Sequence, residues 1–198
     1  LYLCTVEYNM EDERNNIQRM AMNFGTCMGV FWILKFIMFP LGMTTPFLSL
    51  TFIILTMAVP FLGIHYARTY RNRYCDGVIS VGRAFTFTWM MYLFASLLTA
   101  LAHYIYFSYI DDGFILKHCE EQIVTIEQAN LPNMEETVKM LKESLANAKA
   151  LNAIDITMQL LSQNAFIALL MAFPTALFVA KRTTPTNNGK KENDYTQQ

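Results

Sequence analysis

Apolar residues gather in four blocks, at residues 20–39, 47–66, 84–107 and 156–180. Each block has about 20 residues or more, which as a helix is long enough to cross the ~30 Å hydrocarbon core of a bilayer. The second and third blocks contain no Asp, Glu, Lys or Arg, whereas a helix of a soluble core carries polar residues along its outer face. The pattern predicts an all-α integral membrane protein, a bundle of four transmembrane helices.

Proline and capping residues mark the boundaries of these blocks. Pro40 follows the first block and predicts its end. Thr45 and Pro46 supply an N-cap and a first-turn proline for the second, and Ser80 can cap the third. The chain divides into an N-terminal segment, three spans, an external segment, a fourth span and a disordered tail, at 1–19, 20–107, 108–155, 156–180 and 181–198.

The segment 108–155 is too long for a structureless loop, and its apolar residues recur at helical spacing. It predicts an antiparallel helical hairpin outside the membrane. The second arm carries a stripe with coiled-coil spacing, formed by Met134, Val138, Leu141 and Leu145. Two interpretations stay open: the arms bury their stripes on each other, or part of this stripe docks an envelope protein or a second copy of the chain.

Charge sets the expected orientation. The chain has 198 residues, with 15 Lys+Arg against 16 Asp+Glu and a pI near 6.3, which is not the basic balance of a nucleic-acid-binding domain. Cations concentrate before the first block, between the second and third, and after the fourth; acids concentrate in the segment 108–155. The positive-inside rule predicts that both termini are cytoplasmic and that the hairpin lies outside.

Several polar side chains lie inside the spans near their outer ends. They are Lys35 on span one, His103 on span three, and Gln163 and Asn164 on span four. An ionisable residue within a span is by default a candidate functional residue. One hypothesis is that they form an outward-facing polar vestibule that binds a small anion or a lipid head group. The alternative is structural: Lys35 extends to the interface and His103 donates to a helix carbonyl.

Gly25 and Gly29 form a GxxxG motif on span one, which suits close helix packing, within the chain or between two copies. Neither a catalytic motif nor a metal-ligand spacing is present, so we expect no cofactor, no metal and no enzymatic activity. His103, His118 and the Asp111-Asp112 pair share the outer side, but their spacing matches no metal motif.

Two stretches resemble a known family: the run from Asp76 to Phe85 (DGVISVGRAF) and the aromatic Tyr104-Ile105-Tyr106-Phe107 followed by Ile110-Asp111. With them the chain resembles four-helix membrane proteins, found mainly in Bacteroidetes, that are catalogued as domain of unknown function four-one-nine-nine. The resemblance covers the four blocks. It implies a protein of the bacterial cytoplasmic (inner) membrane, and it carries no assigned activity or site residue. With the orientation expected from the charges, the hairpin is periplasmic.

Two functions fit these observations. The first is a non-enzymatic, multi-pass protein of the inner membrane that acts by contact with envelope proteins or with itself through the hairpin. The second is a transporter that handles a small solute or a lipid through the outer polar cluster. A water-filled cavity crossing the midplane would favour transport, and an exposed apolar stripe on the hairpin would favour contact.

Overall fold

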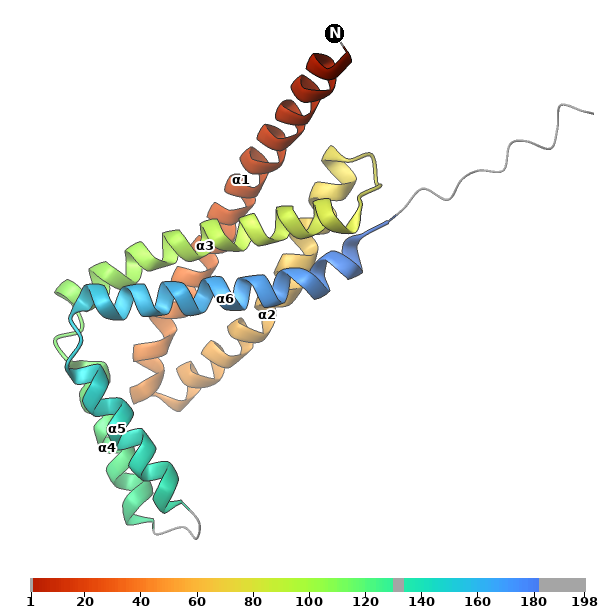
Figure 1. Cartoon of the computed structure of the whole chain (residues 1–198). Helices are drawn as coiled ribbons and strands as arrows, with labels where there is room; N and C mark the ends of the chain where they lie inside the picture. The colour runs from red at the N-terminus through yellow and green to blue at the C-terminus, as the bar shows by residue number, and fades with distance from the viewer. Residues whose placement is uncertain (1, 130–133, 182–198) are drawn as a thin grey trace, which may run out of the picture.

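The computed structural model describes residues 2–129 and 134–181, with side chains from Asn16 onward, so nearly all of the tail expected at 181–198 lies outside the described residues. This part of the chain has six α-helices and no named strand (Figure 1). They are α1 Tyr2–Thr44, α2 Pro46–Tyr74, α3 Val81–Tyr109, α4 Phe114–Gln128, α5 Glu135–Lys149 and α6 Ala153–Val179.

Four of the helices are long and apolar enough to cross a membrane: α1 from Asn16, α2, α3 and α6. The short helices α4 and α5 lie between the third and fourth spans and project from one end of the bundle (Figure 1). The prediction of an all-α, four-span membrane protein with a helical hairpin before the last span is confirmed.

The end of the first span was predicted wrongly. Pro40 does not end the helix: it lies buried inside α1, which continues to Thr44. Proline inside a membrane helix is tolerated where neighbouring elements surround the freed carbonyl. The helix ends instead where the chain turns at Thr45 and Pro46 starts α2. At its other end α1 is continuous from Tyr2, so residues 2–19 of the predicted N-terminal segment are part of the same helix.

The core of the bundle surrounds α3, the most buried of the four spans. α1 and α6 pack against α3, and α2 packs mainly against α1. Small side chains on α3 and α6 are buried in this core and suit close helix packing, among them Ala84, Ala95, Ala168, Ala172 and Ala176, all fully or almost fully buried. Thr88 and Thr99 satisfy their hydroxyls by donating to carbonyls four residues earlier, at 2.8 Å in both cases.

At the end away from the hairpin, the α2–α3 link is fastened to the end of α6. The Ile79 and Lys181 backbones exchange two hydrogen bonds of 3.0 Å. Arg71 donates from Nη1 to the carbonyl of Val179 at 3.0 Å. This contact satisfies one of the last helix carbonyls and places a cation at the negative end of the α6 dipole. The α6 end and the α2–α3 link therefore form one fixed unit, which we call the Arg71 clasp.

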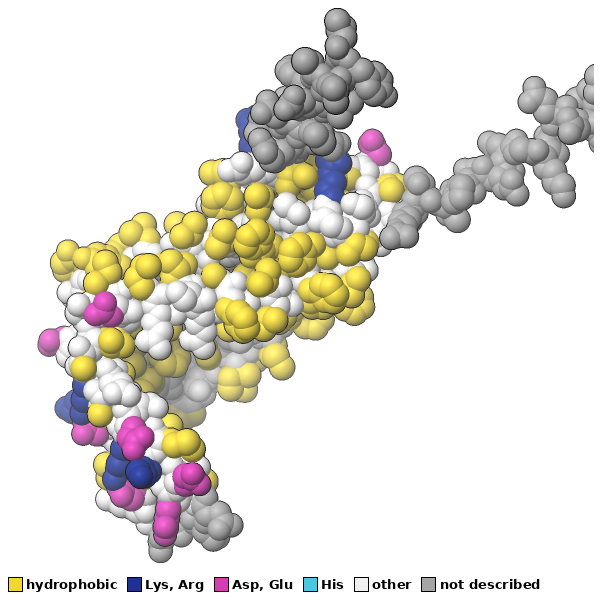
Figure 2. Space-filling view, in the orientation of Figure 1, with side chains coloured by type: hydrophobic (Ala, Val, Ile, Leu, Met, Phe, Trp, Pro, Cys, Tyr) yellow, Lys and Arg dark blue, Asp and Glu magenta, His cyan; other side chains and the backbone are white. Residues whose placement is uncertain are grey.

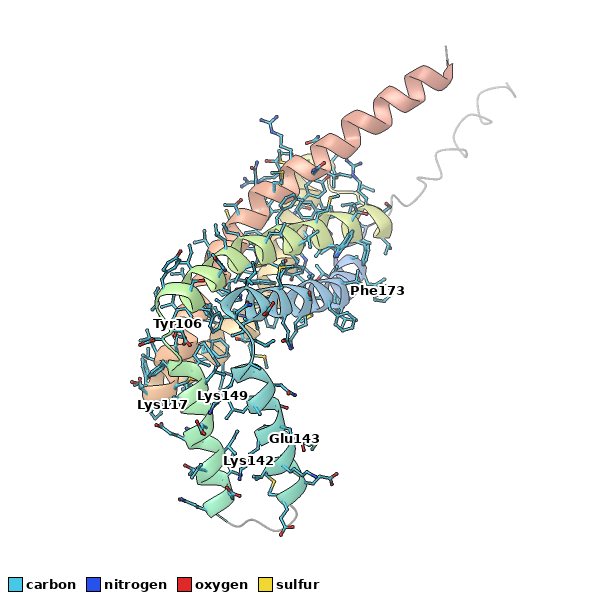
Figure 3. The ribbon with its side chains drawn as sticks, turned by 60° about the vertical axis from the view of Figure 1, so that its left-hand side comes forward. Tyr106, Lys117, Lys142, Glu143, Lys149 and Phe173 are labelled. Carbon is cyan, nitrogen blue, oxygen red and sulfur yellow. The ribbon has the colours of Figure 1, made fainter. Side chains whose placement is uncertain are left out.

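The hairpin is held by an apolar seam with ion pairs across it. Ile123 on α4 and Val138 on α5 are buried, although α5 has no extensive contact except with α4. Lys142 pairs with Glu127 at 2.7 Å and Lys149 with Glu120 at 2.6 Å (Figure 3 labels both lysines). Charged side chains concentrate on the hairpin, and hydrophobic ones cover the visible face of the bundle (Figure 2).

Candidate functional site

A cavity of about 410 Å³ lies beneath the root of the hairpin. α1, α3 and α6 supply most of its wall, Phe52 comes from α2, and the first residues of α4 and the end of α5 close it toward the hairpin. Its apolar wall is aromatic and aliphatic, formed by Trp32, Phe36, Phe39, Phe52, Phe107, Ile115, Leu116, Ala148, Leu151, Ile156 and Leu160. Polar groups from four different segments interrupt this wall, so the cavity is amphipathic.

The structure brings together all four residues of the polar vestibule predicted from the sequence. Lys35 comes from α1, His103 from α3, and Gln163 and Asn164 from α6, and each lines the cavity. Two of them lie further from the ends of their helices than from the expected span boundaries, because α1 and α3 extend further. Lys35 is nine residues from the end of α1 at Thr44, ~14 Å at 1.5 Å per residue, and His103 is six residues from Tyr109, ~9 Å.

Lys35 is held against aromatic rings. Its Nζ lies 5.6 Å from the centre of the Trp32 ring and 5.9 Å from that of Phe52. Cation–π contacts of this kind contribute roughly 0.5–2 kcal/mol. Lys35 makes no ion pair with any residue of 16–129 or 134–181, the range whose side chains are described. The cavity therefore contains a half-buried cation without a protein counter-charge in contact.

Trp32 and His103 bring polar atoms into the wall that have no partner among the described side chains and backbone. Trp32 is 7% exposed and His103 is 5% exposed, and Trp32 Nε1 and His103 Nδ1 are buried without a hydrogen bond. His103 packs edge-on against Phe36, with ring centres 4.2 Å apart. A buried polar atom without a partner costs about 1–3 kcal/mol. The two polar atoms without a partner therefore belong to residues that line the same cavity as Lys35.

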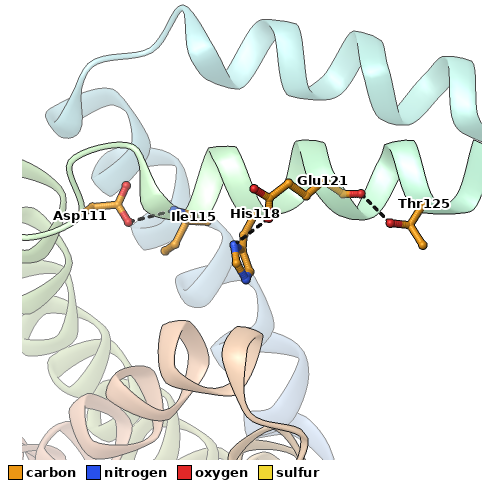
Figure 4. A network of polar contacts seen from close by, with 5 residues as sticks. All are labelled: Asp111, Ile115, His118, Glu121 and Thr125. Atoms are coloured by element: carbon orange, nitrogen blue, oxygen red, sulfur yellow. Dashed lines mark hydrogen bonds and ion pairs between the residues drawn. The ribbon is translucent and has the colours of Figure 1, made fainter.

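Asp111 adds a carboxylate at the hairpin side of the cavity. It is 6% exposed, and its Oδ1 accepts a hydrogen bond from the Ile115 backbone N–H at 3.3 Å, which fixes it at the start of α4 (Figure 4). The sharp turn that places it uses left-handed backbone at Asp112, with φ 43°, and at Gly113, with φ 77°. Burial raises the pKa of the Cys119 thiol on α4, and the negative charge of Asp111 raises this pKa further.

Sequence reasoning missed Trp32, Phe52 and Asp111 as parts of the site. A tryptophan three residues before an intramembrane lysine is one helical turn away, which is a usable signal for a cation–π contact. From the sequence, Asp111 is a candidate only as a metal ligand, together with His103 and His118. No group of three or more His, Cys, Asp or Glu side chains within the described ranges is placed to hold a metal ion.

Gly25 and Gly29 face α3 of the same chain. A Cβ at Gly25 would lie 2.8 Å from the Met91 carbonyl oxygen and 2.8 Å from Phe94 Cβ. At Gly29 the added atom would lie 2.9 Å from Leu98 Cδ2 and 3.3 Å from Ala95 Cα. The two glycines let α1 approach α3 closely. Trp32 and Lys35, one and two turns further along α1, line the same cavity as Thr99 and His103 of α3.

The stripe on the second hairpin arm is largely covered by the first arm. Val138 is 7% exposed, Met134 and Leu145 are half-buried, and Leu141 is 38% exposed. Beyond the seam, His118 Nδ1 lies 3.3 Å from Glu121 Oε2, and Thr125 donates to the Glu121 carbonyl at 2.9 Å (Figure 4). These contacts stabilise α4 locally.

Comparison of the sequence with models of protein families identifies the family of this chain. The family model described as "Protein of unknown function (DUF4199)" matches residues 23–181. The chain belongs to the DUF4199 family. No curated protein and no solved structure matches the chain.

The DUF4199 match contains the whole candidate site. Every residue that lines the cavity, from Trp32 to Asn164, lies within it, and so do the hairpin and both members of the Ile79–Lys181 backbone pair. Among the described residues, the cavity wall is therefore built entirely by the DUF4199 domain.

Proposed function

We propose that this multi-span membrane protein is a non-enzymatic binding protein that holds one amphiphilic, lipid-like molecule in the cavity beneath the hairpin. The observation that carries the proposal is the unpaired cation of Lys35 in a cavity whose remaining wall is largely apolar. A head group with negative charge would neutralise Lys35, and an apolar chain would occupy the aromatic wall.

The shape of the cavity suits part of a lipid better than a small hydrophilic solute. Its volume, about 410 Å³, lies within the ~300–1,000 Å³ range of ligand pockets. Gln159 and Gln163 on α6 are exposed at its rim, so the cavity is open to the surroundings of the bundle there. A bound amphiphile can place its head group on the polar residues while its chain continues along the outer surface of the bundle.

Action through the hairpin stripe has weaker support. The seam is buried between α4 and α5, and two ion pairs fasten the arms to each other. The exposed large apolar side chains of the two hairpin helices are few: Met140 and Leu141 on α5, and Phe114 and Val124 on α4. Single exposed apolar side chains are normal on a protein surface and do not indicate a partner.

We further propose the bacterial cytoplasmic membrane as the location, with both termini cytoplasmic and the hairpin periplasmic. The uneven distribution of cations supports this orientation. A membrane-impermeant thiol reagent on intact cells tests it, in a cysteine-free background. The exposed position Lys139→Cys on α5 should be labelled, whereas the exposed position Asn72→Cys at the other end should react only after lysis. Labelling of Asn72→Cys in intact cells would contradict the orientation.

Native mass spectrometry of the full chain, released from detergent after purification from a phospholipid-containing membrane, tests the binding function. The wild-type protein should retain one phospholipid. Asn164→Trp, which adds volume at the cavity wall, should lose it. Leu170→Trp is the matched control, because it adds the same ring on the exposed side of the same helix. Equal retention by all three proteins, or no retained lipid in the wild type, would contradict the proposal.

A further inference from the structure

The cavity contains two side chains of opposite charge that do not form an ion pair with each other. Lys35 comes from α1 and Asp111 from the link between α3 and α4, and both line the same wall. No ion pair joins them, since the pairs among the described side chains all lie within the hairpin. The cavity is thus close to neutral overall but has separated positive and negative ends.

The two charges lie at different levels along the bundle. Asp111 follows the end of α3 at Tyr109 and stands at the root of the hairpin. Lys35 lies lower: its Nζ contacts the ring of Trp32, one turn earlier on α1. The next residue, Phe36, packs against His103, Tyr106 and Phe107, which precede the end of α3 at Tyr109. At 1.5 Å per residue these contacts of Phe36 lie ~3–9 Å below the end of α3. Proceeding into the bundle, the order is carboxylate, then ammonium, then apolar wall.

This order is complementary to one class of lipid. In a phospholipid with an ethanolamine-type head, the order inward from the membrane surface is ammonium, then phosphate, then acyl chains. The carboxylate of Asp111 would meet the ligand's ammonium, and the ammonium of Lys35 would meet its phosphate. A buried ligand with one charge only would leave either Lys35 or Asp111 uncompensated, which is costly in a low-dielectric site.

We propose that the cavity selects a zwitterionic amphiphile whose head group carries a phosphate and an ammonium, as in phosphatidylethanolamine. The inference rests on the proposed function and adds the class of head group. Lys35 and the amide side chains of Gln159, Gln163 and Asn164 can donate to the phosphate oxygens. One oxygen of Asp111 accepts from the Ile115 N–H, and the lone pairs that remain on the carboxylate can accept from the ammonium.

Trp32 provides a reporter inside the site. The chain has two tryptophans, so Trp89→Phe leaves Trp32 as the single fluorophore. Bromine atoms on acyl chains quench a nearby indole. The full chain in a non-ionic detergent is titrated with phosphatidylethanolamine or phosphatidylglycerol that carry the same brominated chains. The expected result is saturable quenching, with the half-maximal lipid fraction at least about fivefold lower for phosphatidylethanolamine, because phosphatidylglycerol has no ammonium for Asp111.

Two variants and one control assign the preference to the two charges. Lys35→Met should weaken quenching by both lipids. Asp111→Asn keeps the oxygen that accepts from Ile115 and should abolish the preference. Asp112→Asn, the exposed neighbouring residue, should retain it. Retention of the preference in Asp111→Asn, or its loss in Asp112→Asn, would overturn the inference.

The remaining outcomes separate this inference from the proposed function. Equal saturable quenching by both lipids, or tighter binding of phosphatidylglycerol, overturns the zwitterion inference and leaves the lipid-binding function standing. Absence of saturable quenching by either lipid overturns both. Free phosphoethanolamine is added as a competitor at the same concentration as the lipid. If free phosphoethanolamine displaces the brominated lipid as effectively as unbrominated phosphatidylethanolamine does, the ligand is a soluble zwitterion. This result would overturn the lipid assignment.

Discussion

The Nζ atom of Lys35 lies 5.6 Å from the centre of the Trp32 ring, one helical turn earlier on α1. The same atom lies 5.9 Å from the centre of the Phe52 ring on α2. The contact holds a cation within an apolar wall without pairing it to an acid. It explains how a lysine can remain inside a span: the aromatic faces stabilise the ammonium in part, and the rest of its charge stays available to a ligand.

Removal of the Lys35 charge should change stability and lipid binding in opposite directions. Lys35→Met keeps the length of the apolar stem but removes a cation that has no acid partner, so we expect the lipid-free protein to gain up to about 1 kcal/mol of unfolding free energy while lipid retention falls. Thermal unfolding in a lipid-free detergent, followed by circular dichroism, gives the first quantity, and native mass spectrometry gives the second. Loss of stability with unchanged lipid retention would show that Lys35 is structural.

The approach of α1 to α3 depends on the absence of a side chain at Gly25. Gly25→Ala places a Cβ 2.8 Å from the Met91 carbonyl oxygen, so the helices must separate, and we expect a loss of about 1–3 kcal/mol in thermal unfolding. Gly82→Ala is the matched control, because an added Cβ there meets nothing within 4 Å, and it should be neutral or slightly stabilising. Equal effects of the two substitutions would contradict close packing at Gly25.

The Arg71 clasp should stabilise the last turn of α6. Arg71→Met removes the donor to the Val179 carbonyl, so amide hydrogen exchange over residues 176–181 should speed up, with an opening free energy lower by about 1–2 kcal/mol. Arg73→Met removes a cation from the exposed face of the same turn and should leave this exchange unchanged. An unchanged rate in Arg71→Met would show that the Ile79–Lys181 backbone pair alone fixes that end.

Alkylation of Cys119 should respond to pH through its raised pKa. The thiolate is the reactive form, so a folded-state pKa raised by burial and by Asp111 keeps the thiol protonated at neutral pH and slows its reaction. With Cys119 as the single cysteine, the alkylation rate should still rise with pH above ~8.5, where half of an ordinary cysteine is already ionised.

Asp111→Asn removes one of the two causes of this shift, so the midpoint of the Cys119 rate profile should move to lower pH, while Asp112→Asn should not move it. A midpoint at the ordinary value in the wild-type protein would contradict the buried environment of the hairpin root.

The spans could be predicted from the sequence because their apolar blocks are longer than any soluble core helix requires. The end of α1 could not be predicted in this way. Proline usually ends a helix in water, but in a bundle the neighbouring helices shield the carbonyl that Pro40 frees. The helix therefore continues to Thr44. The expected end at residue 39 places Lys35 four residues from the end of its helix, whereas α1 places it nine residues from that end.

The polar residues that the candidate site has inside the spans could be predicted from the sequence. The other residues that line the cavity with them could not. Lys35, His103, Gln163 and Asn164 stand out because polar groups inside a span are costly. Asp111 does not, since an acid just after a span is common, and only the left-handed turn at Asp112 and Gly113 directs the chain so that it lines the cavity. Contacts between segments that are distant in the sequence, such as Lys35 with Phe52, need the fold.

Photo-crosslinking tests the central claim, that the cavity beneath the hairpin binds an amphiphile, most directly. The full chain in detergent receives one equivalent of phosphatidylethanolamine that carries a diazirine next to the glycerol, is illuminated, and is mapped by peptide mass spectrometry. We predict adducts on the cavity-lining residues of α1, α3 and α6, from Trp32 to Phe39, Thr99 to Phe107 and Ile156 to Asn164, with fewer in Lys35→Met. Adducts confined to the exposed side of α2, at Phe47, Met57 and Phe61, would contradict the account.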